Sequence, residues 1–234
     1  MDREQELLKN YQDVHNALCG ACQKAGRPSQ EVTLLAVTKY AQDNDVLFLL
    51  KSGLIRHVGE SRVQQAEKRW TSPDFSRYNT VKHLIGHLQK NKAAKAAQLF
   101  DFIDSLDDFE TAQLLSKHAP VGKVLRVLVQ VKLTQRATQS GLPLAQARQL
   151  VRRLKELPSL QVCGYMGIAP QAASESELRK LFKEVKQAFD EDFATAKERY
   201  LSLGMSEDFV VAVEEGSSLP RIGSKLFATH LEDL

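Results

Sequence analysis

The sequence predicts an α/β fold: a closed parallel (β/α)8 TIM barrel in which residues 1–234 form a single domain. Two observations lead to this prediction. Short apolar, β-prone runs alternate with longer amphipathic segments, and eight such strand-and-helix pairs follow one another along the chain. The length of 234 residues is also close to the ~250 that such a barrel takes. An open, doubly wound sheet is the second choice of fold.

The first half of the chain contains a helix and then four strand-and-helix units. Residues 2–25 carry apolar side chains at three- and four-residue steps, which indicates an amphipathic helix that Gly26 ends. TLLAVT (33–38) is a continuous β-prone run, and DVLFLLKSG (45–53) is a helical segment that ends in a C-cap glycine. The same alternation then predicts strands at 55–59, 81–86 and 101–104, followed by helices at 61–70, 88–99 and 107–118.

The second half repeats the alternation four times. The long apolar run KVLRVLVQV (123–131) predicts a strand that leads into a helix at 143–156. The three later strands are expected at 161–167, 199–203 and 219–223, and their helices at 174–188, at 206–215 and close to the end of the sequence. The loops at 71–79 and 169–174 are too short to hold a second domain.

Composition excludes several classes of protein. The net charge of +3 comes from 32 basic and 29 acidic residues that alternate along the helices, so no basic block marks a nucleic-acid binder. No apolar run approaches the ~20 residues of a membrane span, and the opening residues lack the pattern of a secretory signal. We therefore expect a soluble, cytoplasmic protein. Cys19 and Cys22 are expected to be ordinary helix cysteines, because neither a preceding strand nor a second ligand pair accompanies them.

Lys39 is the first candidate for chemistry, since it directly follows the first predicted strand. In a barrel the reactive residues come from the C-terminal ends of the strands. A lysine in an apolar barrel mouth loses solvation, which favours the neutral, nucleophilic amine that forms a Schiff base. The alternative is a lysine that extends out of the rim or pairs with a carboxylate.

Two glycine-containing turns follow the last two strands: Leu203-Gly204-Met205-Ser206 and Ile222-Gly223-Ser224-Lys225. Barrel enzymes commonly hold a phosphate at these two loops, although each turn alone is also explained as a helix cap. Together with a lysine expected across the mouth, they suit a phosphorylated aldehyde. Pyridoxal 5′-phosphate and the sugar phosphate of a Schiff-base aldolase both fit this description. Arg221 can meet a pyridine nitrogen from the last strand, or it is an interior arginine paired with an acid.

No metal site is predicted. His83 lies on an expected strand and His87 follows a turn, so their four-residue spacing does not place them on one helical face.

Six segments in order carry a resemblance to a known family: LLAVTK (34–39), HVGESRVQ (57–64), HLIGHLQKNK (83–92), GYMGIAP (164–170), LSLGMSEDF (201–209) and EEGSSLPRIGSKLF (214–227). They resemble the successive motifs of the pyridoxal-phosphate homeostasis family, also called the YggS or PROSC family. The resemblance implies a barrel similar to the N-terminal domain of alanine racemase. It also implies covalently bound pyridoxal 5′-phosphate, a carrier role without turnover, and a monomer.

The resemblance assigns site residues by matching positions. Lys39 matches the cofactor lysine and Arg221 the contact to the pyridine nitrogen. The phosphate and ring-edge positions match Ser202, Gly204, Met205, Ser206, Gly223 and Ser224. Two positions depart from the family pattern. Ser61 stands where an asparagine is usual, which shortens or removes a contact near the ring, and Gln139 stands where many members have a lysine, which puts an auxiliary phosphate site in doubt.

The expected function is therefore intracellular vitamin B6 homeostasis, in which the chain holds pyridoxal 5′-phosphate and hands it on to apoenzymes that depend on this cofactor. The main alternative is an amino-acid racemase. A two-base racemase needs a proton-transfer group on each face of the substrate, and Lys39 supplies one face. Alanine racemase takes the opposite tyrosine from a second domain. Tyr40, Tyr165 or His87 can take that place here, so the alternative stays open.

Overall fold

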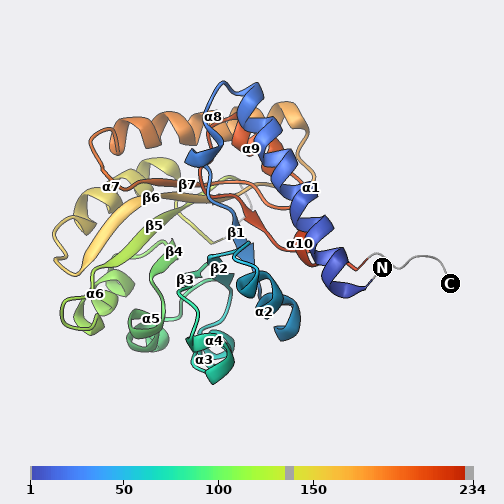
Figure 1. Cartoon of the computed structure of the whole chain (residues 1–234). Coiled ribbons are helices and arrows are strands. Elements are labelled where there is room, and N and C mark those ends of the chain that lie inside the picture. Colours follow the sequence, from blue (N-terminus) through green and yellow to red (C-terminus); the bar gives the residue numbers. More distant parts are fainter. Residues whose placement is uncertain (1, 135–139, 230–234) are drawn as a thin grey trace.

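Eight parallel strands form the centre of the computed structural model, which describes residues 2–134 and 140–229 (Figure 1). The strands are β1 (Leu35–Val37), β2 (His57–Glu60), β3 (Val81–Leu84), β4 (Phe102–Leu106), β5 (Leu125–Lys132), β6 (Leu160–Ile168), β7 (Tyr200–Ser202) and β8 (Arg221–Ile222). The sheet order is β7-β6-β5-β4-β3-β2-β1-β8, so each strand lies beside its neighbour in sequence and β8 returns to β1. The predicted (β/α)8 barrel is confirmed.

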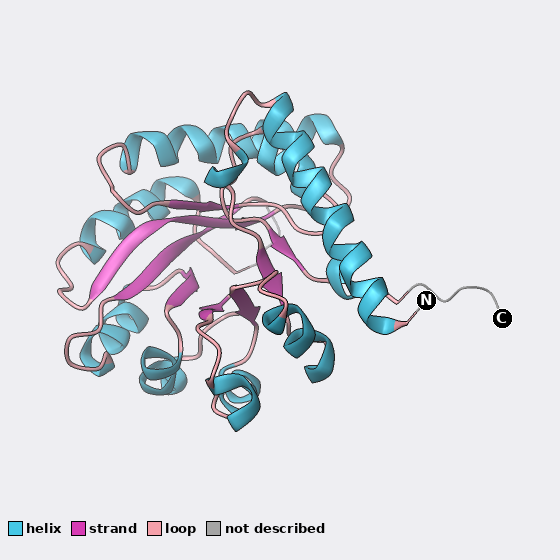
Figure 2. Cartoon of the chain, viewed as in Figure 1, coloured by secondary structure: helices cyan, strands magenta, loops and turns pink. Residues whose placement is uncertain are grey.

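Helices surround the strands on the outside (Figure 2). They are α1 (Arg3–Lys24), α2 (Asp43–Lys51), α3 (Val63–Trp70), α4 (Pro73–Ser76), α5 (Ala93–Leu99), α6 (Phe109–His118), α7 (Leu144–Leu154), α8 (Glu175–Asp192), α9 (Phe209–Glu214) and α10 (Ser224–Phe227). Two short 3-10 helices, Ser29–Glu31 and Lys90–Lys92, complete the regular structure described. None of the helices described is long and apolar enough to cross a membrane.

The predicted elements differ from the observed ones mainly at their ends. The expected loop at 71–79 contains α4, which begins with Pro73 at its first position, where the missing N–H group costs no hydrogen bond. α6 begins at Phe109 because the Asp108 side chain accepts hydrogen bonds from the first-turn amides of Glu110 and Thr111. α8 extends four residues beyond the expected end.

Helix α1 is additional to the eight strand-and-helix units. Its N-cap is Asp2, and it packs across α9 and α10 with an apolar face that includes Leu7, Val14 and Leu18 (Figure 1). Arg3 donates hydrogen bonds to Asp45 and to the carbonyl groups at the end of α10. α1 therefore covers the side of the barrel where the last strand returns to the first.

The core has two layers. The larger layer lies between the strands and the surrounding helices. A smaller cluster fills the inside of the barrel and consists of Leu35, Leu128, Cys163, Met166 and Leu219. Side chains of a strand alternate between these two layers, so a residue's position in the alternation decides whether it faces the barrel interior or the helices.

The junction of β7 and β8, which we call the seam, is closed by backbone hydrogen bonds together with serine side chains. The N–H groups of Ser218 and Leu219 donate to the Leu201 carbonyl at 2.9 and 3.1 Å, and the Arg221 N–H donates to the Gly204 carbonyl at 3.0 Å. The backbone N–H groups of Leu201 and Leu203 donate to the hydroxyl groups of Ser218 (2.9 Å) and Ser217 (3.2 Å). The Ser202 hydroxyl donates to the Leu219 carbonyl at 2.9 Å. These bonds close the barrel where the described strands form no regular ladder.

A β-bulge in β6 changes the direction of the side chains that follow it. The register with β5 shifts at Cys163, and Gly164 has φ +151°, where an added Cβ would lie 1.8 Å from the Tyr200 carbonyl oxygen. After the bulge Tyr165 points outward against Phe193, while Met166 points into the barrel. The bulge therefore removes Tyr165 from the barrel interior.

Candidate cofactor-binding site

Lys39 lies at the C-terminal end of β1, as predicted. It is half-buried, and its Nζ lies 4.9 Å from the centroid of the exposed Tyr40 ring. β1 pairs with β8 through Leu35 and Arg221 and through Ala36 and Ile222. The turn after β8 is therefore a neighbour of Lys39, and the expectation that the two face each other across the mouth is wrong, because closure of the barrel makes the first and last strands adjacent.

The two predicted glycine-containing turns meet. The buried Ser206, which follows β7, accepts a hydrogen bond at 3.4 Å from the backbone N–H of Lys225 in α10. Ser224 at the start of α10 is exposed, and so is Met205, at 40%. The turns after β7 and β8 thus form one cup beside Lys39, with hydroxyl groups from both sides.

Two glycines shape this cup. Gly204 has φ +87°, and a Cβ there would lie 2.6 Å from the Ala212 Cβ and 2.8 Å from the Phe209 Cα, so only glycine permits this turn. At Gly223 an added Cβ would lie 3.2 Å from the Val37 Cβ. Gly223 therefore lies close against the end of β1.

Arg221 is buried in the barrel interior beneath the cup. Its Nη1 donates to the Ser202 carbonyl (2.7 Å) and hydroxyl (2.8 Å), and its Nη2 donates to the Gly167 carbonyl (2.7 Å). Burial lowers the pKa of the guanidinium to about 10, against the opposing effect of Asp104 and Asp208, so Arg221 stays a cation at neutral pH. Three of the five N–H groups of an arginine are used, and the others can meet a ligand.

Ser202 acts on Arg221 and does not reach the cup. Its side chain is fully buried, and its hydroxyl both accepts from Arg221 and donates to the Leu219 carbonyl. Of the residues matched to the phosphate and ring edge, Ser202 is therefore the one that the structure separates from the others. Sequence position alone does not reveal this, because the burial depends on the seam.

A chain of three polar side chains links the neighbouring strands β2, β3 and β4. His83 Nδ1 lies 3.0 Å from the Asp104 carboxylate, and His83 Nε2 lies 3.0 Å from His57 Nδ1. Asp104 and His83 are fully buried, whereas His57 is partly exposed. Both bonds are satisfied when His83 donates to Asp104 and accepts from a neutral His57. The sequence analysis missed this chain, because the three residues come from three different strands.

The remaining sequence candidates are placed as follows. The Tyr165 hydroxyl donates to Asp192 at 2.6 Å behind the sheet, and burial raises its pKa, so it is unavailable as a base at the mouth. Tyr40 and His87 are exposed. Ser61 follows β2, and its backbone approaches Gly86 so closely that a Cβ there would lie 2.2 Å from the Ser61 carbonyl oxygen. Gln139 lies outside the described residues.

Metal binding finds no support in the part of the chain that the structure describes, since it contains no group of three or more His, Cys, Asp or Glu side chains arranged to hold an ion. His83 bonds to Asp104 and His57, as described above. Cys19 and Cys22 are free thiols on α1. Both cysteines lie on a helix, as expected.

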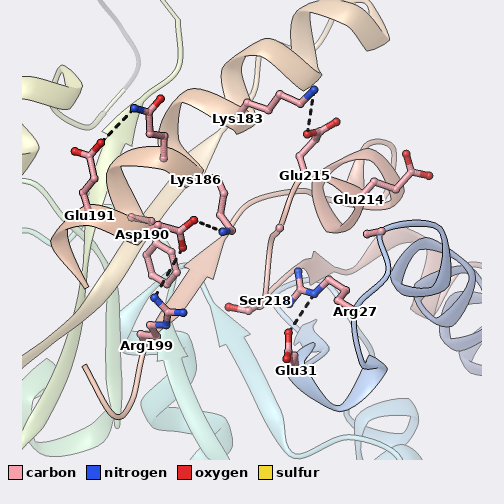
Figure 3. A pocket seen from close by; sticks show the side chains of 14 residues that line it. Arg27, Glu31, Lys183, Lys186, Asp190, Glu191, Arg199, Glu214, Glu215 and Ser218 are labelled. Atoms are coloured by element: carbon pink, nitrogen blue, oxygen red, sulfur yellow. Dashed lines mark hydrogen bonds and ion pairs between the residues drawn. The ribbon is translucent and has the colours of Figure 1, made fainter. Parts of the chain in front are cut away.

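A large pocket of about 1000 Å³ lies at the opposite end of the barrel (Figure 3). It is lined by Arg27, Arg199 and Ser218, which precede β1, β7 and β8, and by residues of α8 and α9. Its basic side chains face acidic neighbours: Arg27 faces Glu31, Lys183 faces Glu215, and Lys186 and Arg199 face Asp190. The pocket is thus separate from Lys39 and internally neutralised.

The residues at the mouth fit a phosphorylated aldehyde. Lys39 offers an amine, the cup offers the hydroxyl groups of Ser206 and Ser224, and the buried Arg221 offers a cation. Within the described part of the chain, Arg221 pairs with no carboxylate at hydrogen-bond distance, since its acceptors there are neutral oxygens. A ligand acceptor that reaches this buried position would therefore meet a positive charge.

Comparison with known proteins shows the family of the chain. The alanine racemase N-terminal domain family matches residues 20–230. The pyridoxal phosphate homeostasis protein of Escherichia coli K12 is 33% identical over 232 residues, covering 96% of this chain and 97% of that protein. The chain belongs to the pyridoxal phosphate homeostasis family. Another protein of that name, from Aquifex aeolicus, is 31% identical over 211 residues and covers 88% of this chain and 91% of its own length.

Two solved structures show which folds this chain resembles. PipY of Synechococcus elongatus PCC7942, solved with pyridoxal phosphate bound, is 33% identical, with a TM-score of 0.77 over 85% of this chain and 93% of PipY. An alanine racemase of Clostridium difficile is 14% identical, with a TM-score of 0.71 over all of this chain and 58% of that chain. The latter likeness concerns the fold alone. Within the pyridoxal phosphate homeostasis family, this chain therefore has the expected barrel similar to the racemase domain.

Proposed function

We propose that the chain binds pyridoxal 5′-phosphate as a Schiff base on Lys39 and hands it on to apoenzymes that need it, in intracellular vitamin B6 homeostasis. The observation that carries the proposal is the position of Lys39 beside one cup formed by the turns after β7 and β8. PipY, a relative at 33% identity that covers 85% of this chain, was solved with this cofactor bound. The proposal includes residues 1–234 acting as one cytoplasmic, monomeric, cofactor-binding domain.

Each residue has a proposed role. Lys39 supplies the amine, and the hydroxyl groups of Ser206 and Ser224, with the backbone of Gly204, Met205 and Gly223, surround the phosphate. Arg221 meets the pyridine nitrogen, and Ser202 holds Arg221 in place. When bound, the cofactor supplies an aldehyde that forms a reversible covalent bond with amines. Among these residues only Lys39 is a covalent partner.

The proposed role is a carrier without turnover, and the placement of the described candidates weakens the racemase alternative. Tyr165 lies behind the sheet and donates to Asp192. Tyr40 is 87% exposed on the same turn as Lys39, and His87 is exposed. If Arg221 meets the pyridine nitrogen as proposed, its buried positive charge would oppose protonation of that nitrogen. An unprotonated ring stabilises negative charge on a bound amino acid less effectively.

The test is covalent trapping. Wild-type protein reconstituted with pyridoxal 5′-phosphate should absorb in the visible range, lose that absorbance on borohydride treatment, and gain one pyridoxyl group at Lys39 by mass spectrometry. Lys39→Ala should gain none, while Lys90→Ala, which removes an exposed lysine paired with Glu110, should behave as wild type. A colourless protein would favour a sugar-phosphate aldolase, and an adduct on another lysine of Lys39→Ala would contradict the assignment.

A further inference from the structure

Arg69 on α3 holds the turn that carries Lys39. Lys39 and Tyr40 are the central residues of a turn in which the Ala41 N–H donates to the Thr38 carbonyl at 3.0 Å. The Arg69 guanidinium donates to both ends of this turn, from Nη1 to the Thr38 carbonyl at 2.8 Å and from Nη2 to the Ala41 carbonyl at 2.9 Å. One planar group therefore fixes the backbone on both sides of Lys39.

Arg69 is itself held by two carboxylates. Its Nη1 donates to Glu60 Oε1 at 2.8 Å, and its Nε donates to Asp43 Oδ1 at 2.7 Å. Glu60 is fully buried at the end of β2, and its Oε1 also accepts from the Thr38 hydroxyl at 2.7 Å. The turn is thus tied through Arg69 and Glu60 to the neighbouring strand of the barrel.

The contacts differ from an ordinary surface ion pair. The Arg69 side chain is only 14% exposed, and it bridges four acceptors at 2.7 to 2.9 Å. Exposed pairs contribute little because solvent screens them and their side chains stay mobile. A cavity of about 340 Å³, lined by residues 41–44 and Arg69, lies beside the end of the turn at Ala41. The Arg69 guanidinium therefore fixes the turn through hydrogen bonds to its backbone.

We infer that Arg69 is a positioning residue for Lys39: it holds the lysine amine in the geometry needed for reaction with the cofactor aldehyde, without touching the cofactor. This inference rests on the proposed function. It requires the planar, forked donor set of arginine, because a lysine ammonium can pair with Glu60 but cannot span both carbonyl groups of the turn. The cup and Arg221 lie on other elements, so noncovalent binding should not depend on Arg69.

The experiment separates covalent reaction from binding. Apo-protein is mixed with pyridoxal 5′-phosphate, quenched with borohydride at timed intervals, and mapped by mass spectrometry to give the rate of adduct formation at Lys39. Arg69→Met should slow this rate at least about tenfold, since misplacing a reacting group by a fraction of an ångström lowers rates strongly. Arg69→Lys should fall between wild type and Arg69→Met. Affinity for pyridoxamine 5′-phosphate, which has no aldehyde, should be unchanged in both.

Two controls keep the test decisive. Arg148→Met removes ion pairs to Glu191 and Asp192 outside the barrel and should change neither the rate nor the affinity. The double variant Glu60→Gln with Arg69→Met leaves no unpaired buried carboxylate, and it replaces Arg69→Met in the rate measurement if that variant does not fold.

The outcomes distinguish the inference from the function on which it rests. A folded Arg69 variant that reacts at the wild-type rate overturns the inference, and so does a parallel loss of pyridoxamine 5′-phosphate affinity, which would show general damage to the mouth. Absence of an adduct at Lys39 in the wild type would instead refute the proposed function.

Discussion

The partly buried His57 should make the protein less stable in mild acid. Its ring lies at the end of the chain formed with His83 and Asp104, 3.0 Å from the His83 ring nitrogen. Burial is the main reason why its pKa falls from 6.5 to about 4, and the nearby charges of His83 and Arg56 act in the same direction. The folded protein therefore keeps His57 neutral where the unfolded chain has already bound a proton.

The direction and size of the effect follow from this difference. Above pH 6.5 His57 is neutral in both the folded and the unfolded protein, so it does not lower the free energy of unfolding. As the pH falls from 6.5 toward 4, the unfolded chain binds a proton that the folded protein does not, and the free energy of unfolding decreases. At 1.36 kcal/mol per pKa unit, the gap between 6.5 and about 4 corresponds to a loss on the order of 3 kcal/mol below this window. At about pH 4.5 most of that loss, roughly 2.5 kcal/mol, should already be present.

Urea unfolding of the wild type and of His57→Gln at about pH 7.5 and pH 4.5 tests this reasoning. Glutamine can donate to His83 but cannot take up the proton, so the variant should lose less free energy of unfolding between the two pH values. The difference between the two losses should be roughly 2 kcal/mol. His87→Gln, at an exposed histidine, is the control and should follow the wild type. Equal losses in the wild type and His57→Gln would refute the assignment.

Three further outcomes are expected. Ser206→Ala with Ser224→Ala should weaken the binding of pyridoxal 5′-phosphate by ~1.5–3 kcal/mol per hydroxyl group in a titration, while pyridoxal, which lacks the phosphate, should bind nearly as before. Arg221→Met should leave two buried carbonyl groups without a donor and lower the free energy of unfolding in urea by roughly 2–5 kcal/mol, whereas an unchanged midpoint would mean that water replaces the guanidinium. Gly204→Ala should lower the melting temperature because of its φ of +87° and its close contacts, and Gly20→Ala, in a helix with open space around it, should raise stability by ~0.5–1 kcal/mol; a rise in both would contradict the strain at Gly204.

The order of strands and helices could be predicted from the sequence, because each unit shows its own periodicity. Even β8, with two residues, was predicted, since the apolar run that contains it stands between turn residues. The position of Lys39 at the end of a strand and the meeting of the two cup turns also follow from local patterns once a barrel is assumed.

The errors come from features that local patterns do not contain. Strict alternation from Cys163 places Tyr165 inside the barrel, and the bulge reverses that direction. The Ser202 hydroxyl looks available in the sequence, but closure of the barrel buries it against Arg221. The contacts of Arg69 with the Lys39 turn join residues about thirty positions apart. A single sequence carries no periodic signal for such long-range contacts.

The seam makes one part of the barrel depend on amino-acid identity in a way that the other strand junctions do not. A ladder of backbone hydrogen bonds survives most substitutions, because every residue except proline brings the same N–H and C=O groups. At the seam, hydroxyl oxygens of Ser217 and Ser218 take over part of the ladder by accepting from the N–H groups of Leu203 and Leu201, and most other residue types cannot provide such oxygens. Most strand positions can therefore change residue type without losing backbone hydrogen bonds. Replacing Ser217 or Ser218 would instead remove hydrogen bonds that help to close the barrel.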